Sequence, residues 1–248
     1  MSQTKINPGG KTVFISGSNR GIGKAIAVEL LEQGAEKVYA GARDPSSLDE
    51  LKEKYGEKLV PVQLDVTDDN SINAAASQVR DIDILVNNAG VFAAGGIFSE
   101  QALSSLETNL NVNLWGIVKL TNSVLEQLRQ PKETAIINIS SVTGLANMPM
   151  AATYSVSKAA VHSLTQGIRG ELANDNVLVM GVYPGPIDTD MAKDLQMEKD
   201  SPENVAKNIV QSLIEGREYV FPDVMSGQVG ALYAANPKSV EDNFGKYV

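Results

Sequence analysis

Short apolar runs rich in β-branched residues alternate with amphipathic segments from one end of the chain to the other. The run at 11–16, KTVFIS, stops at a glycine, and the segment after it repeats isoleucine and leucine at helical spacing as far as Gly34. Continuous apolar strands that alternate with helices indicate a parallel sheet covered on both faces. The pattern therefore predicts an α/β chain with a doubly wound parallel sheet.

The same pattern gives about seven strands and the helices between them. The expected strands cover 11–16, 37–42, 58–64, 83–90, 134–140, 176–184 and 218–221, and the expected helices cover 21–34, 47–55, 70–79, 102–128, 153–173 and 202–215, before a final amphipathic stretch. Pro61 falls inside the third strand, which places that strand near an edge of the sheet. No repeat, linker or break in composition divides the chain, so we expect one domain over 1–248.

Composition excludes several classes of chemistry. The chain has no cysteine and a single histidine, His162, so we expect no disulfide, no thiol nucleophile and no metal site, and we interpret His162 as structural. A net charge of −9 argues against nucleic acid as a partner. No apolar run approaches the roughly 20 residues that cross a bilayer, and the first residues lack the apolar core of a signal peptide. We therefore expect no membrane partner and a cytoplasmic location.

A glycine-rich turn joins the first strand to the first helix. The sequence SGSNRGIG has glycines at 17, 21 and 23, so it matches neither GxGxxG nor the phosphate-binding P-loop, whose spacing and Ser or Thr are missing. A strand, a glycine turn and a helix N-terminus together can nevertheless bind a pyrophosphate. The alternative is an ordinary turn with incidental glycines. If the turn binds a pyrophosphate, we expect the sheet to be Rossmann-like.

Tyr154 and Lys158, in the stretch YSVSK, are four residues apart in a predicted helix. This spacing puts a phenol and an ammonium on one helical face, one turn apart. The pair could simply belong to a solvated surface. Alternatively, the ammonium lowers the pKa of the phenol, so that Tyr154 can exchange a proton near neutral pH.

Six short motifs occur in an order and at a spacing that resemble the short-chain dehydrogenase/reductase family, over about residues 11–190. They are the GxxxGxG turn, Asp65-Val66, Asn87-Asn88-Ala89-Gly90, Asn113, Ser141 with Tyr154-x-x-x-Lys158, and the segment from Tyr183 to Thr189. The resemblance implies hydride transfer between a nicotinamide cofactor and a C=O or CH–OH group. It also implies roles for individual residues.

In that family Tyr154 would be the general acid or base, Ser141 would bind the substrate oxygen, Lys158 would hold the nicotinamide ribose and Asn113 would join a water-mediated proton relay. The cofactor-binding residues implied by the resemblance are Gly17, Ser18, Asn19, Arg20, Gly21, Ile22, Gly23, Arg43, Asp65, Val66, Asn88, Ala89, Gly90, Tyr154, Lys158, Pro184, Gly185, Ile187 and Thr189.

The end of the second strand indicates which nicotinamide cofactor binds. An acid about 20 residues after the glycines would hold the ribose hydroxyls of NAD, but the chain has Ala42 and Arg43 there. A guanidinium suits a 2′-phosphate, and Arg20 could supply a second contact. Asp44 could reach the ribose, yet Pro45 after it suggests that it caps a helical turn. We predict NADP(H).

The expected function is NADPH-dependent reduction of a small ketone or aldehyde, or oxidation of the corresponding secondary alcohol. Apolar candidates for the substrate cleft are Val91, Phe92, Met148, Met150 and Met191, and residues 186–203 would form a lid. The alternatives are a 3-oxoacyl thioester reductase and an NADP-binding redox sensor without turnover. By the same resemblance, we expect a homodimer or homotetramer that pairs through the helices at 102–128 and 153–173.

Overall fold

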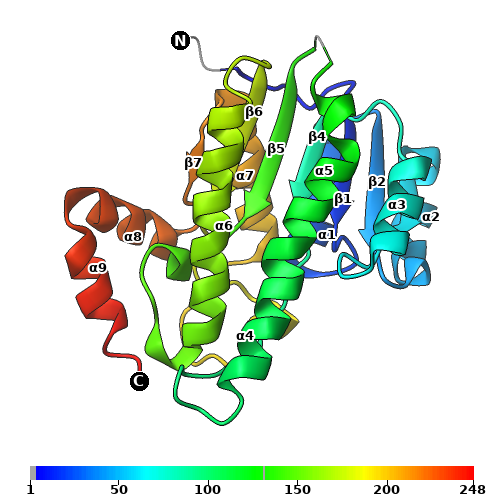
Figure 1. Cartoon of the computed structure of the whole chain (residues 1–248). Helices are drawn as coiled ribbons and strands as arrows, with labels where there is room; N and C mark the ends of the chain where they lie inside the picture. The colour runs from blue at the N-terminus through cyan, green and yellow to red at the C-terminus, as the bar shows by residue number, and fades with distance from the viewer. Residues whose placement is uncertain (1–3, 131) are drawn as a thin grey trace.

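Seven parallel strands form one sheet at the centre of the molecule (Figure 1). The structure is a computed structural model that describes residues 4–130 and 132–248. The strands are β1 (Thr12–Ser16), β2 (Lys37–Ala42), β3 (Leu59–Gln63), β4 (Ile84–Asn87), β5 (Thr134–Ile139), β6 (Val177–Val182) and β7 (Tyr219–Val220). Their order across the sheet is β3-β2-β1-β4-β5-β6-β7. The prediction of a single Rossmann-like α/β domain with about seven parallel strands is confirmed.

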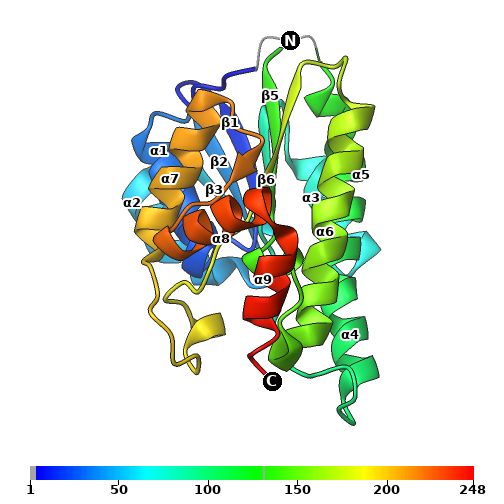
Figure 2. The same cartoon turned by 90° about the vertical axis from the view of Figure 1, so that its left-hand side faces the viewer.

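Helices cover both faces of the sheet, as Figure 2 shows with the sheet seen nearly edge-on. The helices are α1 (Gly21–Glu32), α2 (Asp49–Tyr55), α3 (Asp69–Gln78), α4 (Ala102–Leu110), α5 (Gly116–Leu128), α6 (Ala152–Glu171), α7 (Pro202–Glu215), α8 (Val224–Ala235) and α9 (Pro237–Phe244). Helices α1, α2 and α7 lie on one face, and α3, α5 and α6 lie on the other. Within the described residues, no helix is long and apolar enough to span a bilayer.

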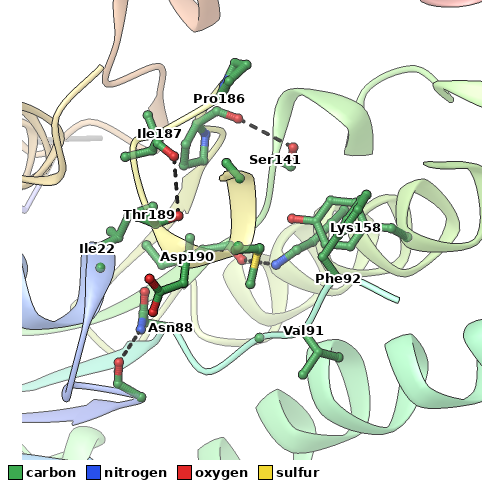
Figure 3. A pocket seen from close by; sticks show the side chains of 18 of the residues that line it. Ile22, Asn88, Val91, Phe92, Ser141, Lys158, Pro186, Ile187, Thr189 and Asp190 are labelled. Carbon is green, nitrogen blue, oxygen red and sulfur yellow. Dashed lines mark hydrogen bonds between the residues drawn. The ribbon is translucent and has the colours of Figure 1, made fainter. Parts of the chain in front are cut away.

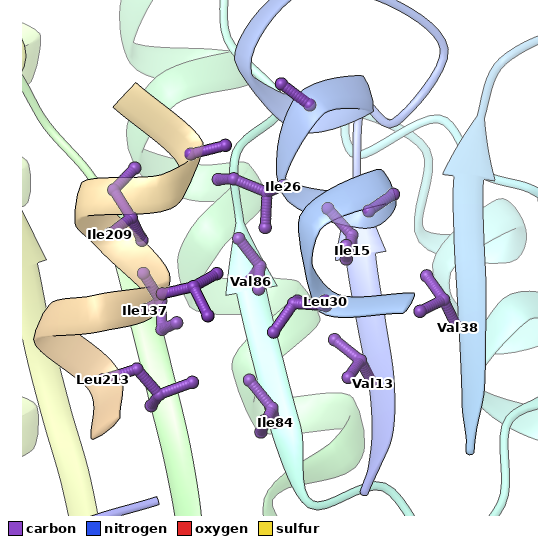
Figure 4. Close-up of a cluster of buried hydrophobic side chains, with 14 of the residues drawn as sticks. Val13, Ile15, Ile26, Leu30, Val38, Ile84, Val86, Ile137, Ile209 and Leu213 are labelled. Carbon is purple, nitrogen blue, oxygen red and sulfur yellow. The ribbon is translucent and has the colours of Figure 1, made fainter. Parts of the chain in front are cut away.

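The core consists of two apolar layers, one on each side of the sheet. Figure 4 shows the first layer, in which Ile26 and Leu30 of α1 and Ile209 of α7 pack on Val13 and Val86 of the strands. In the second layer, residues of the opposite strand face such as Phe14, Leu85 and Ile136 pack on α5. Side chains alternate between the two faces along a strand. Burial of both faces therefore explains why the strands appear in the sequence as unbroken apolar runs.

The strand order reverses at β1, whose neighbours are β2 and β4. In an open parallel sheet, the crevice at the carboxyl ends of the strands on either side of such a reversal is where ligands bind. The loops that follow β1, β4, β5 and β6 all line one cleft of about 630 Å³. The topology therefore places the sequence motifs that end these strands in a single site.

Two local features match the sequence expectations in detail, and two differ from them. Pro61 lies in β3, which is an edge strand. Asp44 caps the short 3₁₀ turn η1 (Pro45–Leu48), because its carboxylate accepts a hydrogen bond from the Ser46 amide at 3.0 Å. The helix expected at 102–128 is one helical run, but a π-helical turn, η3 (Asn111–Trp115), separates α4 from α5. The expected strand at 83–90 is shorter, since only its first half, 84–87, is paired as β4.

Candidate active site

The glycine turn after β1 exposes backbone to the cleft. Gly17 and Gly21 have left-handed φ angles of +69° and +54°, which favour glycine. Helix α1 begins at Gly21, and Arg20 before it makes no capping hydrogen bond with its side chain. No acidic residue occupies the first turn. The amide groups at the start of α1 therefore remain available to an anion, and this fits the pyrophosphate of a dinucleotide.

Asn88, after β4, holds this turn in place. Its side-chain amide donates hydrogen bonds to the backbone oxygens of Ser16 and Gly17, at 3.0 and 2.9 Å. A Cβ atom on Gly23 would collide with the Gly17 oxygen and with the Asn88 amide. Asn88 lines the cleft, but its donor atoms are directed at the protein backbone rather than into the cavity (Figure 3). Its first role is to join the loops after β1 and β4.

The cleft also receives the ends of β2 and β3. Ala42 and Arg43 line it, whereas Asp44 is occupied by its capping bond. Asp65 lines it as well, and its carboxylate accepts hydrogen bonds from the Thr67 amide and hydroxyl at 2.9 and 2.7 Å. These bonds lower the pKa of the Asp65 carboxyl, and the charge of Arg43 adds to the effect. This part of the cleft therefore contains one guanidinium and one fixed carboxylate.

Tyr154 and Lys158 lie on α6 and both line the cleft. The Lys158 Nζ atom lies 5.6 Å from the centre of the Tyr154 ring and donates a hydrogen bond to the Ile139 carbonyl at 2.9 Å. Lys158 is buried, and burial lowers its pKa to about 8. The pair therefore belongs to the site and not to a solvated surface.

The structure does not agree with the expectation that the Lys158 ammonium lowers the pKa of the Tyr154 phenol. Burial raises the pKa of the Tyr154 phenol above its ordinary value, and the interaction with Ser141 opposes the rise only in part. The physical reason is that desolvation disfavours the phenolate, while the Lys158 ammonium points at a backbone carbonyl. In this state Tyr154 is a protonated acid.

Ser141 follows β5 and faces the same part of the cleft (Figure 3). Its oxygen accepts hydrogen bonds from the amide and the hydroxyl of Thr143, at 3.2 and 3.1 Å. Its own hydroxyl donates only a long bond of 3.5 Å to the Pro184 carbonyl. The proton of Ser141 is thus weakly held, and the hydroxyl is free to donate to a ligand oxygen.

Apolar side chains also line the cleft that contains Ser141, Tyr154 and Lys158. The Phe92 and Tyr154 rings meet edge to face, with centres 5.0 Å apart. Val91, Met148, Met150 and Met191 line the cleft as well, so each apolar candidate from the sequence lies there. The site combines an uncapped helix N-terminus, a buried lysine, a protonated tyrosine and an apolar wall. Within 4–130 and 132–248, no cluster of His, Cys, Asp and Glu could hold a metal ion.

Comparison with known proteins assigns this arrangement to a family. A sequence model of the family described as short chain dehydrogenase matches residues 11–200. The chain belongs to the short-chain dehydrogenase family. A 3-oxoacyl-(acyl-carrier-protein) reductase, FabG, of Aquifex aeolicus is 34% identical over 236 residues, which are 87% of this chain and 95% of the relative. The prediction of family membership is confirmed, and the protein is an oxidoreductase of this family.

Solved short-chain dehydrogenases share the fold over almost the whole chain. One from Burkholderia cenocepacia, in complex with NADP, has a TM-score of 0.90 and 30% identity and covers 96% of this chain and 99% of its own. Another, from Burkholderia phymatum in complex with NAD, has a TM-score of 0.83 and 22% identity and covers 94% and 96%. The same fold is therefore found with either cofactor.

The short-chain dehydrogenase cleft contains most, but not all, of the residues expected from the sequence. The expected residues that line it are Gly17, Asn19, Arg20, Gly21, Ile22, Arg43, Asp65, Val66, Asn88, Ala89, Gly90, Ser141, Tyr154, Lys158, Pro184, Gly185, Ile187 and Thr189. Ser18 and Gly23 do not line it. The Ser18 hydroxyl donates to the Ile15 carbonyl at 2.9 Å, and Gly23 packs against Gly17, so both shape the turn from behind.

Asn113 also lies outside the cleft. It is fully buried in the π-helical turn η3, and its side-chain amide exchanges hydrogen bonds with the Val91 backbone, at 2.8 and 3.0 Å. The amide also donates to Ser157, at 3.0 Å. The structure therefore shows Asn113 joining η3 to the loop after β4 and to α6, and the proton relay stays a prediction.

Arg20 and His162 have partners that the sequence does not indicate. Arg20, expected at a phosphate, forms an exposed ion pair with Asp190 at 3.0 Å. His162 lies outside the cleft, where its Nδ1 atom is 2.7 Å from the hydroxyl of the buried Tyr183. Burial lowers the pKa of His162.

Several lining residues were not expected at all. They include Leu64, Thr67, Val112, Thr143, Met225 and Tyr247. Leu64, Thr67, Val112 and Thr143 stand within two residues of an expected site residue and could have been found from neighbouring motifs. Met225 and Tyr247 come from the C-terminal segment, outside the six motifs.

Proposed function

We propose that the protein is an NADPH-dependent carbonyl reductase acting on small, neutral ketones or aldehydes, and on secondary alcohols in reverse. The observation that carries the proposal is that Ser141, Tyr154 and Lys158 line the same cleft as an uncapped helix N-terminus. A protein that only binds the cofactor, such as a redox sensor, needs no protonated tyrosine beside a weakly bonded serine hydroxyl. The geometry therefore favours turnover.

The residues around the cleft suggest how each group would act in reduction. The bound cofactor would supply a hydride to the carbonyl carbon. Ser141 would donate a hydrogen bond to the carbonyl oxygen, and Thr143 strengthens that donor by bonding to the serine oxygen. As the electron pair of the C=O bond moves to oxygen, Tyr154 would transfer its phenolic proton there, leaving an alcohol. A raised phenol pKa keeps this proton in place beforehand.

Lys158 would act beside the proton donor rather than on the substrate. Its ammonium, fixed by the Ile139 carbonyl, is positioned next to the Tyr154 ring and would stabilise the phenolate left by proton transfer. We also infer that it holds the nicotinamide ribose. Gly90, Pro184, Gly185, Ile187 and Thr189 would form the walls around the nicotinamide.

The preference for NADP(H) is supported by the end of β2. Arg43 lines the cleft, and Asp44, which could otherwise bind ribose hydroxyls, is used as a cap. The structural relative with the TM-score of 0.90 was solved with NADP. Steady-state kinetics with both cofactors test this preference. We expect a lower KM for NADPH, and a lower KM for NADH would contradict it.

A second candidate is the reduction of 3-oxoacyl thioesters, favoured by the name of the Aquifex aeolicus relative. The reaction at the carbonyl would be the same for both candidates. They differ only in the part of the substrate, away from the carbonyl, that the cleft would bind. A screen of NADPH oxidation against ketones, aldehydes and 3-oxoacyl thioesters separates them. We expect ketones or aldehydes to give the highest kcat/KM. A screen in which no carbonyl compound is reduced would favour the redox sensor.

We further propose that residues 186–203 form a lid. Pro186, Ile187 and the residues from Thr189 to Met197, apart from Lys193, line the cleft, and a backbone bridge between Ile187 and Asp200 closes the segment into a loop. The Arg20–Asp190 ion pair joins this loop to the glycine turn across the cleft.

We also infer that two copies pair through α4, α5 and α6. This surface carries three exposed apolar side chains, Leu103, Trp115 and Val156, with exposures of 83%, 51% and 37%. Apolar groups gathered on the helices of one face are typical of a surface that a partner covers.

A further inference from the structure

The C-terminal helix is fixed against the loop that follows β5. Val240 and Phe244 of α9 are buried in a small apolar cluster with Val142 and Met148. Val142 follows Ser141 directly, and Met148 lines the cleft. Figures 1 and 2 both show α9 beside this part of the molecule, with the chain end near the base of α6. The helix therefore places the last residues of the chain at the substrate end of the cleft.

Two backbone hydrogen bonds then fix the position of Tyr247. Its amide donates to the Phe244 carbonyl at 3.0 Å, which turns the chain after α9, and its carbonyl accepts from the Met150 amide at 2.9 Å. Met150 belongs to the 3₁₀ turn η5 (Pro149–Ala151), which leads directly into α6 and Tyr154. The tail is thus bonded to the segment that supports the proton donor.

Tyr247 lines the cleft and is 41% exposed, so a ligand in the cleft has room to cover part of this residue. The same cleft is lined by Met148, Met150 and Met225, which are flexible, polarisable and suited to aromatic contacts. An aromatic ring supplies a large apolar contact area at a small cost in conformational entropy. This wall is suited to a flat, neutral, apolar group rather than a charged one.

We propose that Tyr247 is a specificity-determining substrate contact, and that its ring packs against an aryl group carried by the ketone that Tyr154 protonates. The inference rests on the proposed carbonyl reduction for its substrate class, and it adds the residue that recognises the part of the substrate away from the reacting carbonyl. Selection by this ring favours aryl ketones over small aliphatic ones.

The test measures binding rather than turnover. In the Tyr154→Phe protein loaded with NADPH, the dissociation constant of 2-acetylnaphthalene is measured by equilibrium dialysis. Adding Tyr247→Ala is expected to weaken binding by about tenfold, since loss of an aromatic contact and its buried area removes an appreciable part of the affinity. Adding Tyr247→Phe, which keeps the ring, should change the constant by less than about twofold.

Two controls separate this contact from general damage to the tail. Val248→Ala alters a neighbouring side chain that is 99% exposed and does not line the cleft, so it should leave the constant unchanged. The dissociation constant of NADPH and the Tm should be retained in every variant. Equal binding by the Tyr247→Ala and parent proteins, or no saturable binding by the parent, would overturn the proposal. If Tyr247-dependent binding is found and the wild-type protein reduces no ketone, the contact stands and the proposed function fails.

Discussion

At the residue scale, burial decides the protonation states of the two titrating groups on α6. Desolvation disfavours charge, so it raises the pKa of Tyr154 and lowers that of Lys158 to about 8. Tyr154 is therefore protonated at neutral pH, and Lys158 is the group that titrates in the accessible range. The pKa of Lys158 therefore lies below that of Tyr154, whereas a free lysine has a slightly higher pKa than a free tyrosine.

A pH profile follows from the lowered pKa of Lys158. Below about pH 8 the Lys158 ammonium is charged. Above this pH the charge is lost, and with it the proposed assistance to cofactor binding and to the phenolate. We expect kcat/KM for NADPH, which reports groups of the free enzyme, to be flat below this pH and to fall above it. Lys158→Arg should be slower but show no fall near pH 8, because a guanidinium stays protonated. A wild-type profile flat to pH 10 would contradict the role of Lys158.

The proposed preference for NADPH can be tested at a single residue, Arg43. Arg43→Ala should raise the KM for NADPH about tenfold or more and leave that for NADH nearly unchanged, since hydrogen bonds to charged groups contribute about 1.5–3 kcal/mol. Lys24→Ala is the matched control, because it removes the same charge from α1 at a position that does not line the cleft. Equal effects of the two substitutions on NADPH would point to net charge rather than to a phosphate contact.

At the element scale, the junction between β1 and α1 depends on a close backbone approach. Gly23→Ala would push a methyl group into the Gly17 carbonyl and the Asn88 amide, which cannot move without opening the turn. We expect it to lower the free energy of unfolding by about 3 kcal/mol or more, or to prevent folding. Denaturant unfolding measures the change.

The control for this glycine is one that has space around it. A Cβ atom on Gly227, in α8, meets nothing within 4 Å. Gly227→Ala should therefore stabilise the protein by about 0.5–1 kcal/mol, because alanine favours the helix. If Gly23→Ala were as well tolerated as Gly227→Ala, the tight junction would not be needed.

The elements show where sequence reasoning succeeds and where it fails. The strands were predictable because burial on both faces leaves unbroken apolar runs, as at 134–139. The ion pair between Arg20 and Asp190 was not predictable, since it joins residues 170 positions apart through a loop. Nor was the position of Tyr247, because α9 is placed by packing of Val240 and Phe244 and not by any motif. A local sequence pattern indicates which segments are buried and where turns occur. Contacts between distant loops depend on the tertiary structure, so the pattern does not predict them.

At the scale of the whole molecule, the proposed pairing through α4, α5 and α6 has a test of its own. Leu103→Asp should convert a particle of twice the chain mass into one of single mass in light scattering, because a charge would be buried in the interface. Val224→Asp makes the same change at a site on α8 that is 76% exposed, and it should leave the mass unaltered. A single-chain mass for the wild-type protein would contradict pairing through α4, α5 and α6.

The strand order explains why most of the site could be located before the fold was known. Motifs that end β1, β4, β5 and β6 must meet at one edge of a parallel sheet, so their order along the chain predicts one cleft. Protonation states were beyond such reasoning. The direction of the Tyr154 pKa depends on how completely α6 and Phe92 exclude water, and spacing alone carries no such information.

The proposed reaction depends on the Tyr154 hydroxyl group, and removing that group is its most direct test. For Tyr154→Phe, single-turnover oxidation of NADPH with the best ketone of the screen should slow by about 100- to 10,000-fold, the contribution of a positioned proton donor. The dissociation constant of NADPH should change little. A variant that reduces the ketone at the wild-type rate would contradict the central claim.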